Sequence, residues 1–183
     1  MNERTPPDPS GALHELVDAH GAAVDSLLRG LEADRTARED LWSEVFTVAY
    51  RRIDDLAHLD QRQARAWLLT VTRNVTANHA RRATTRRRTL EQLSREPALR
   101  EPSAEAEYLA AIPDGQRDRR ISAAWHSLPH AHREVLALDA NGLRGPDIAL
   151  TLDISHQAAR SRLMRARRAF LTAFQTCGAT SHD

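Results

Sequence analysis

The segment 155–168 places arginine, glutamine and serine side chains on one side of a single helix. At roughly 100° per residue, this side holds Gln157, Arg160, Ser161, Met164, Arg165 and Arg168. The opposite stripe is apolar and consists of Ala159, Leu163, Ala166, Phe170 and Phe174. Arg and Gln make bidentate hydrogen bonds to guanine and adenine, and further arginines neutralise phosphates. The pattern predicts a helix that reads duplex DNA; the alternative is a bundle helix with a solvated arginine face.

A second basic surface falls in the segment 61–88, which holds eight Arg and no acidic residue. Within RAWLLTVTRNVTANHARR its polar side chains are Arg65, Arg73, Asn74, Asn78, His79, Arg81 and Arg82. Because the segment contains no acid to pair with them, these side chains need a partner, and a polyanion such as nucleic acid fits. Trp67 lies at the edge of this surface and also on the apolar stripe, so base stacking and core packing both remain open for it.

The net charge of the whole chain hides this segregation. The 183 residues include 26 basic residues, all of them Arg, and 25 acidic residues, for a formal net charge of +1. Residues 1–60 carry −7, residues 61–88 carry +8, residues 89–153 carry −4 and residues 154–182 carry +5. Blocks of one sign are typical of interaction surfaces, although two solvated helix faces would give the same count.

Helices must position these residues. Seven Gly and eight Pro leave few helix breakers, and no useful strand alternation is present, so we expect an all-α chain. Apolar residues recur at helical spacing over about 13–31, 36–53 and 64–82, which predicts one compact bundle. Thr36 and Glu39 have the spacing of a capping box at the start of the second helix.

A further group of helices follows the charged, Pro-containing segment 83–118, which predicts a linker. We expect one helix from Ile121 and another from Pro129 to a stop at Asn141-Gly142. Two more are predicted over about 145–152 and 155–174, and their pattern matches a helix-turn-helix. Within it, Ser155 is a natural N-cap, and Asp153 stands in the turn.

Several classes of protein are disfavoured. The single Cys177 excludes a disulfide framework and a Cys-rich zinc site. His126, His130 and His132 cluster, but the chain has no HExxH pair, so we expect no metal, no cofactor and no catalytic residues. The absence of a long apolar run and of a secretory signal predicts a cytoplasmic protein without membrane insertion.

The two helical groups together resemble bacterial RNA polymerase sigma factors. EDLWSEVFTVAYRRID and RAWLLTVTRNVTANHARR resemble region 2, and WHSLPHAHREVLALDANGLRGPDIALTLDISHQAARSRLMRARRAF resembles region 4. A chain with only these two domains resembles the extracytoplasmic-function (ECF) group. The resemblance implies two small helical domains joined by a flexible linker, with this division: disordered tail 1–11, region 2 domain 12–82, linker 83–118, region 4 domain 119–174 and tail 175–183.

The resemblance also implies roles for individual residues. The −35 promoter element would be read by His156, Gln157, Arg160, Ser161, Arg165 and Arg168. The −10 element, with a flipped nontemplate base, would be held by Asp60, Gln61, Arg65, Trp67, Arg73, Asn74, Asn78, Arg81 and Arg82. Polymerase docking would use Asp40, Ser43, Glu44, Thr47 and Arg51, although the family often has Gln where Ser43 stands.

The function that this resemblance implies is promoter recognition and strand separation without catalysis. The partners would be promoter DNA and core RNA polymerase, contacted at its β′ clamp and β flap. Sigma factors of this group are often held by an anti-sigma factor, and the sequence leaves open whether this chain has one. The alternative is a free-standing regulator that binds DNA through the helix-turn-helix alone.

Overall fold

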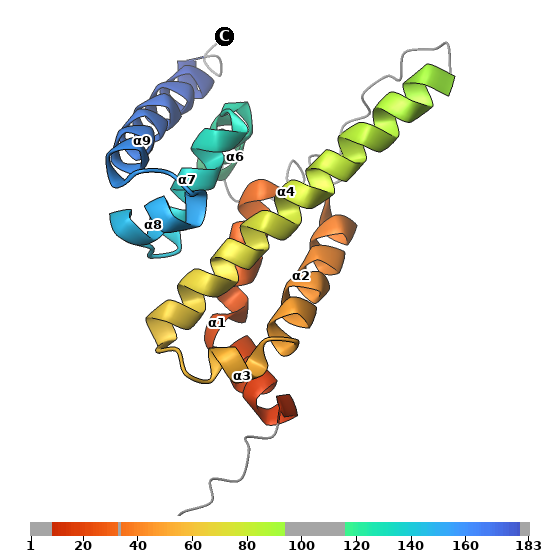
Figure 1. The fold of residues 1–183 in the computed structure, drawn as a ribbon. Helices are drawn as coiled ribbons and strands as arrows, with labels where there is room; N and C mark the ends of the chain where they lie inside the picture. The colour runs from red at the N-terminus through yellow and green to blue at the C-terminus, as the bar shows by residue number, and fades with distance from the viewer. Residues whose placement is uncertain (1–8, 33, 94–115, 180–183) are drawn as a thin grey trace, which may run out of the picture.

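The computed structural model describes residues 9–32, 34–93 and 116–179, and its elements are all helices, as the sequence predicts. Figure 1 shows α4 running between α1–α3 on one side and α6–α9 on the other. The helices are α1 (Pro9–Leu31), α2 (Arg35–Tyr50), α3 (Ile53–Leu56), α4 (Gln61–Leu93), α6 (Gln116–Ser127), α7 (His130–Ala140), α8 (Gly145–Leu152) and α9 (His156–Ala179).

The first four helices form the compact bundle that the periodicity predicts. Their apolar stripes meet in one core, where Val45 and Leu68 are fully buried. The same core includes Val24, Leu28, Leu41, Phe46, Ala49, Leu56 and Val75. Removing large aliphatic side chains from water is the main stabilising contribution, at about 25 cal/mol per Å² of apolar surface.

The start of α2 differs from the prediction. The N-cap is Asp34, whose carboxylate accepts a hydrogen bond of 3.1 Å from the backbone N–H of Ala37. The predicted cap, Thr36, lies inside the first turn of the helix. Aspartate ranks with the best N-cap residues, and the cap therefore lies two residues before the predicted one.

The ends of two other helices also lie beyond their predicted positions. The helix α4 continues to Leu93 and α9 to Ala179, because no Gly or Pro interrupts the first before Pro97 or the second before Gly178. At the other end of the chain, α1 already begins at Pro9, and Pro is favoured in a first turn. The remaining parts of the predicted tails and linker, 1–8, 94–115 and 180–183, lie outside the described residues.

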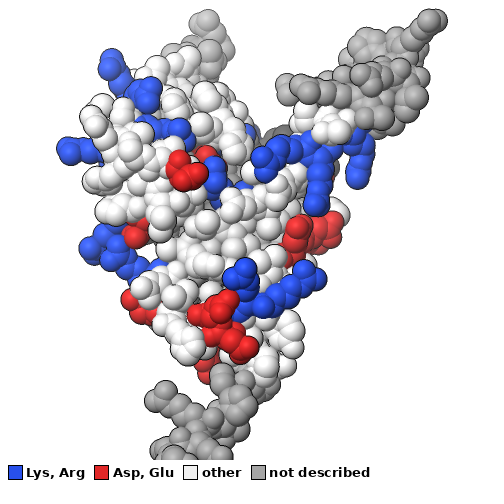
Figure 2. Space-filling model, in the orientation of Figure 1, with Lys and Arg blue, Asp and Glu red and all other residues white. Residues whose placement is uncertain are grey.

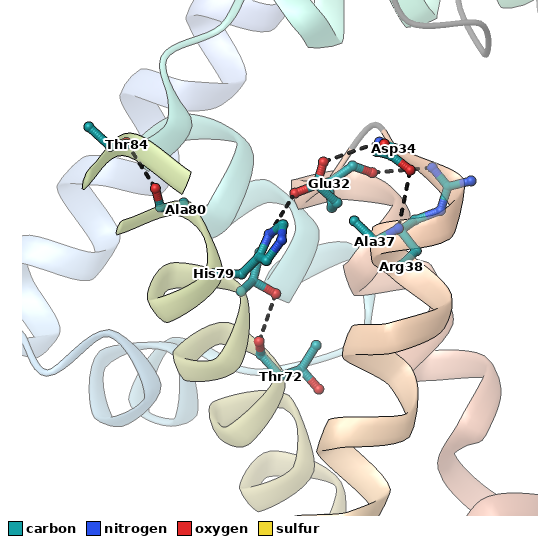
Figure 3. A network of polar contacts seen from close by, with 9 residues as sticks. Glu32, Asp34, Ala37, Arg38, Thr72, His79, Ala80 and Thr84 are labelled. Carbon is teal, nitrogen blue, oxygen red and sulfur yellow. Dashed lines mark hydrogen bonds and ion pairs between the residues drawn. The ribbon is translucent and has the colours of Figure 1, made fainter. Parts of the chain in front are cut away.

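A polar network joins the α1–α2 connection to α4 (Figure 3). The Glu32 carboxylate lies 3.5 Å from His79 Nδ1 and accepts a hydrogen bond of 3.1 Å from the backbone N–H of Asp34. The carbonyl of Glu32 accepts a further bond of 3.2 Å from Arg38. Glu32 therefore connects the α1–α2 connection to α2 through Arg38 and to α4 through His79.

The helix-turn-helix is present as predicted. Asp153 ends α8 in the left-handed conformation at φ 52°, where Asp is tolerated better than most residues. The Ser155 hydroxyl then accepts a hydrogen bond of 3.1 Å from the backbone N–H of Ala158 and caps α9. One turn earlier, Gly142 ends α7 at φ +81°, a conformation that favours glycine.

The two halves also share a hydrophobic core, which sequence periodicity did not reveal. Leu27 of α1 and Leu69 of α4 are fully buried against side chains from α7–α9. The C-terminal members of this core include Val135, Leu138, Leu143, Ile148, Ala149, Leu152, Ala159 and Ala166. The long helix α4 therefore contributes apolar side chains to both cores.

Candidate nucleic-acid interfaces

The predicted reading face of α9 points to solvent. His156, Gln157 and Arg160 are exposed at the start of the helix, and Arg165 and Arg168 are exposed further along. Ser161, the remaining predicted residue, is half-buried. On the opposite side Ala159 and Ala166 are buried. The arrangement presents amide and guanidinium donors to a ligand while the helix keeps its apolar stripe in the core.

Contacts with the neighbouring helices fix the position of α9. Arg167 donates a hydrogen bond of 2.7 Å to the Asp139 carboxylate of α7. At its N-terminus, His156 lies so close to α8 that a Cβ placed on Gly145 would be 2.8 Å from His156 Nε2. Asp139 and Gly145 are therefore positioning residues that sequence reasoning did not single out.

The basic side chains of α4 fall into two groups. The outer group, Asn74, Asn78, Arg81 and Arg82, is exposed. Figure 2 shows basic side chains gathered where α4 projects from the body. Within this group Arg81 donates a hydrogen bond of 2.6 Å to Asn78, which holds its guanidinium along the helix.

The inner group, Arg62, Arg65 and Arg73, contacts the C-terminal half. Arg73 donates a hydrogen bond of 2.7 Å to Glu134 of α7, whose side chain is only 7% exposed. The prediction that this surface has no acidic partner is therefore wrong. The prediction considered only the segment 61–88, whereas Glu134 lies 61 residues from Arg73 along the chain and Glu32 contacts His79 from the α1–α2 connection.

The start of α4 is a reciprocal capping arrangement. The Asp60 carboxylate accepts a hydrogen bond of 2.8 Å from the backbone N–H of Gln63, and the Gln63 side chain accepts one of 3.0 Å from the backbone N–H of Asp60. Asp60 and Gln61 are both exposed. Trp67 is partly buried against the N-terminal core, which supports its packing role.

The predicted docking face of α2 is exposed along its whole length. The exposed residues are Asp40, Ser43, Glu44, Thr47 and Arg51. Ser43 and Thr47 donate hydrogen bonds of 3.0 Å and 2.8 Å to the carbonyls four residues earlier, those of Glu39 and Ser43. The other face of the helix carries the buried core residues, so this surface is available to a partner.

Two titratable groups near the basic surface have shifted pKa values. Burial, and then the positive charge of Arg65, lower the pKa of His20 below its ordinary value. The hydrogen bond and the charge of Asp147 raise the pKa of Arg62. Both shifts reflect the close approach of α4 to its neighbours.

Within the described residues, no group of three or more His, Cys, Asp or Glu side chains has a geometry that could hold a metal ion. The described helices also include none that is long and apolar enough to cross a membrane.

Comparison with known proteins finds one family model and several solved structures that are similar to this chain. Residues 16–86 match the family model of sigma-70 region 2. The sigma factor RpoE of Bartonella quintana, solved with the anti-sigma factor NepR, is 21% identical, with a TM-score of 0.68 over 88% of this chain and 95% of that chain. CnrH, solved with the cytosolic domain of CnrY, is 23% identical, with a TM-score of 0.61 over 90% of this chain and 88% of that chain. No curated protein matches.

The N-terminal bundle thus matches the sigma-70 region 2 model, and the chain shares its fold with these two solved proteins along most of its length.

Proposed function

We propose that the protein is a sigma factor of the ECF group and directs core RNA polymerase to promoters through three separate surfaces. The exposed face of α2 docks on polymerase. The α3–α4 connection and the basic side of α4 hold the −10 element, and α9 reads the −35 element. The observation that supports this division is that a region 2 match and an exposed reading helix occur in one chain with the fold of sigma factors.

The residue assignments follow from exposure and chemistry. On α9, Gln157 and Arg160 are placed to reach base edges, while Arg165 and Arg168 reach phosphates. On α4, the exposed amides of Asn74 and Asn78 can bond to an unstacked base, and Arg81 and Arg82 follow the backbone of the separated strand. Base flipping costs a few kcal/mol, which these contacts offset.

The protein has no reaction of its own in this proposal, since polymerase supplies the chemistry, and it acts in the cytoplasm. The solved RpoE is in complex with the anti-sigma factor NepR, and CnrH is in complex with the cytosolic domain of CnrY. We therefore include such a protein among the candidate partners. A free-standing helix-turn-helix regulator is not favoured, because it would not require the matched region 2 domain.

Run-off transcription tests this function. Core RNA polymerase is incubated with the purified chain and a library of randomised promoters, and the transcripts are sequenced. We expect a set of start sites that depends on the chain and shares two upstream elements. Start sites that are the same with and without the chain would contradict the proposal.

A further inference from the structure

An apolar side chain, Met164, lies in the middle of the reading face of α9. It is 67% exposed, so most of the side chain is in solvent rather than in the core. At about 100° per residue, it lies about 40° from Arg160 and from Arg168 around the helix axis, and about 20° from Gln157. These three polar side chains are exposed and flank Met164.

The exposure of Met164 does not by itself indicate a site. Four other large apolar side chains of the described residues are exposed: Tyr50, Ile121, Leu150 and Leu171. Single exposed apolar side chains are ordinary on protein surfaces. Among these five, however, Met164 alone lies within the segment 155–168 that carries the predicted reading residues. Its position, rather than its exposure, is the feature that needs a ligand.

The spacing of Met164 matches that of side chains that reach bases in the major groove. Gln157, Arg160, Ser161 and Met164 occupy positions i, i+3, i+4 and i+7 of α9. Homeodomain recognition helices contact bases through residues with this same spacing. Two helical turns, about 10.5 Å long, fit within a groove about 12 Å wide. Leu171 lies about 10.5 Å beyond Met164 along the helix and therefore falls outside this window.

The chemistry of the major groove limits what Met164 can contact. Arg and Gln form hydrogen bonds with guanine and adenine, whereas the Met thioether is only a weak acceptor. A Met side chain instead gains free energy when apolar surface is removed from water. The major-groove edges of the four bases carry one apolar group, the C5 methyl of thymine. The unbranched, flexible Met chain is well suited to pack against it.

We propose that Met164 is a specificity-determining residue for the −35 element and reads a thymine through its C5 methyl group. The inference rests on the proposed function, because it gives the reading face of α9 a base preference that its polar side chains do not provide. The thymine can belong to either strand, so the element has an A·T pair opposite Met164. This pair lies within about two base pairs of the one that Arg160 contacts, since the two residues are about 6 Å apart along the helix.

Selection of −35 elements from a randomised library tests this role. Holoenzyme is assembled from core polymerase and the parent chain, Met164→Ala or Leu171→Ala, and the bound promoters are sequenced. We expect the parent to prefer an A·T pair at one −35 position, and Met164→Ala to lose that preference. Leu171→Ala should keep it. This variant is the matched control, because it removes an exposed apolar side chain from the same side of α9 outside the base-contacting window.

Deoxyuridine in place of the preferred thymine removes only the methyl group and keeps the base pair. The affinity of the parent holoenzyme should fall about fourfold, which corresponds to about 0.8 kcal/mol for one buried CH₂-sized group. Met164→Ala should bind the two duplexes equally. Met164→Leu should retain most of the discrimination and Met164→Gln should lose it, although Leu and Gln are both similar to Met in size.

The outcomes separate this role from the proposed function. Three results would overturn the role of Met164 alone: no A·T preference in the parent, a preference that persists in Met164→Ala, or equal affinity of the parent for thymine and deoxyuridine. An equal loss of preference in Leu171→Ala would also overturn it, because the effect would then not depend on a base contact. A parent holoenzyme that selects no −35 element would contradict both the proposed function and the inference that rests on it.

Discussion

At the residue scale, Arg160 allows DNA reading to be tested separately from polymerase docking. It is exposed on the reading face of α9, and α9 lies in the opposite half of the chain from α2. Arg160→Ala should weaken −35-dependent initiation about tenfold, since a bidentate base contact contributes about 1–3 kcal/mol. Affinity for core polymerase, measured by fluorescence titration, should be unchanged.

The control for this variant is Arg167→Ala on the same helix. Arg167 pairs with Asp139 of α7, so its loss should lower stability slightly and leave promoter selectivity intact. If Arg160→Ala loses polymerase binding and initiation to the same extent, the substitution has disturbed folding, and the reading role of Arg160 is not supported.

The buried His20 should make stability depend on pH. Its pKa in the folded chain is lowered from 6.5, first by burial and then by Arg65. Below pH 6.5, His20 becomes protonated in the unfolded chain before it becomes protonated in the folded chain, so the free energy of unfolding decreases as the pH falls. Above pH 6.5, the stabilising contribution of neutral His20 is fully present. Urea unfolding at about pH 7.5 and about pH 5.5 should therefore show a smaller difference for His20→Asn than for the parent. Equal differences would contradict the assignment.

At the element scale, the start of α2 depends on one side chain. Asp34→Ala removes the hydrogen bond to the Ala37 N–H and should lower the free energy of unfolding by about 1 kcal/mol. Thr36→Ala is the matched control, because Thr36 lies inside the helix rather than at the cap, and it should have little effect. Urea titration of the two variants measures the difference. A larger loss of unfolding free energy in Thr36→Ala than in Asp34→Ala would contradict this assignment and place the N-cap at Thr36.

The helices show which structural features the local sequence predicts and which it does not. The helix-turn-helix was predictable because Ser155 and the α8–α9 turn are local signals, and the structure gives each its expected conformation. The length of α4 was not predictable, because an Arg-rich sequence without Gly or Pro is compatible with both a helix and a linker. Nothing in the periodicity indicated where such a segment stops being helical.

At the scale of the whole molecule, Gly30 sets the distance between the halves. A Cβ at this position would lie 3.2 Å from the Trp125 ring and 3.3 Å from Ala137 Cβ, which is tighter than ordinary contact. Gly30→Leu should therefore push α1 away from α6 and α7, and small-angle X-ray scattering should show a larger radius of gyration. Gly21→Ala is the control: its Cβ would have contacts of 3.6 Å and 3.9 Å, so the dimensions should not change. An unchanged radius for Gly30→Leu would contradict this role.

The sequence by itself determined the helices, the two basic surfaces and the helix-turn-helix, because periodicity, caps and charge blocks are local properties. Only the tertiary structure decided which groups meet those surfaces. Arg73 and Glu134 are 61 residues apart, and Arg62 and Asp147 are 85 residues apart. Such pairs form only when packing of the apolar faces brings their helices together. No local pattern encodes that packing, so the free basic side of α4 that the sequence predicted is, in the folded chain, partly covered by its own C-terminal half.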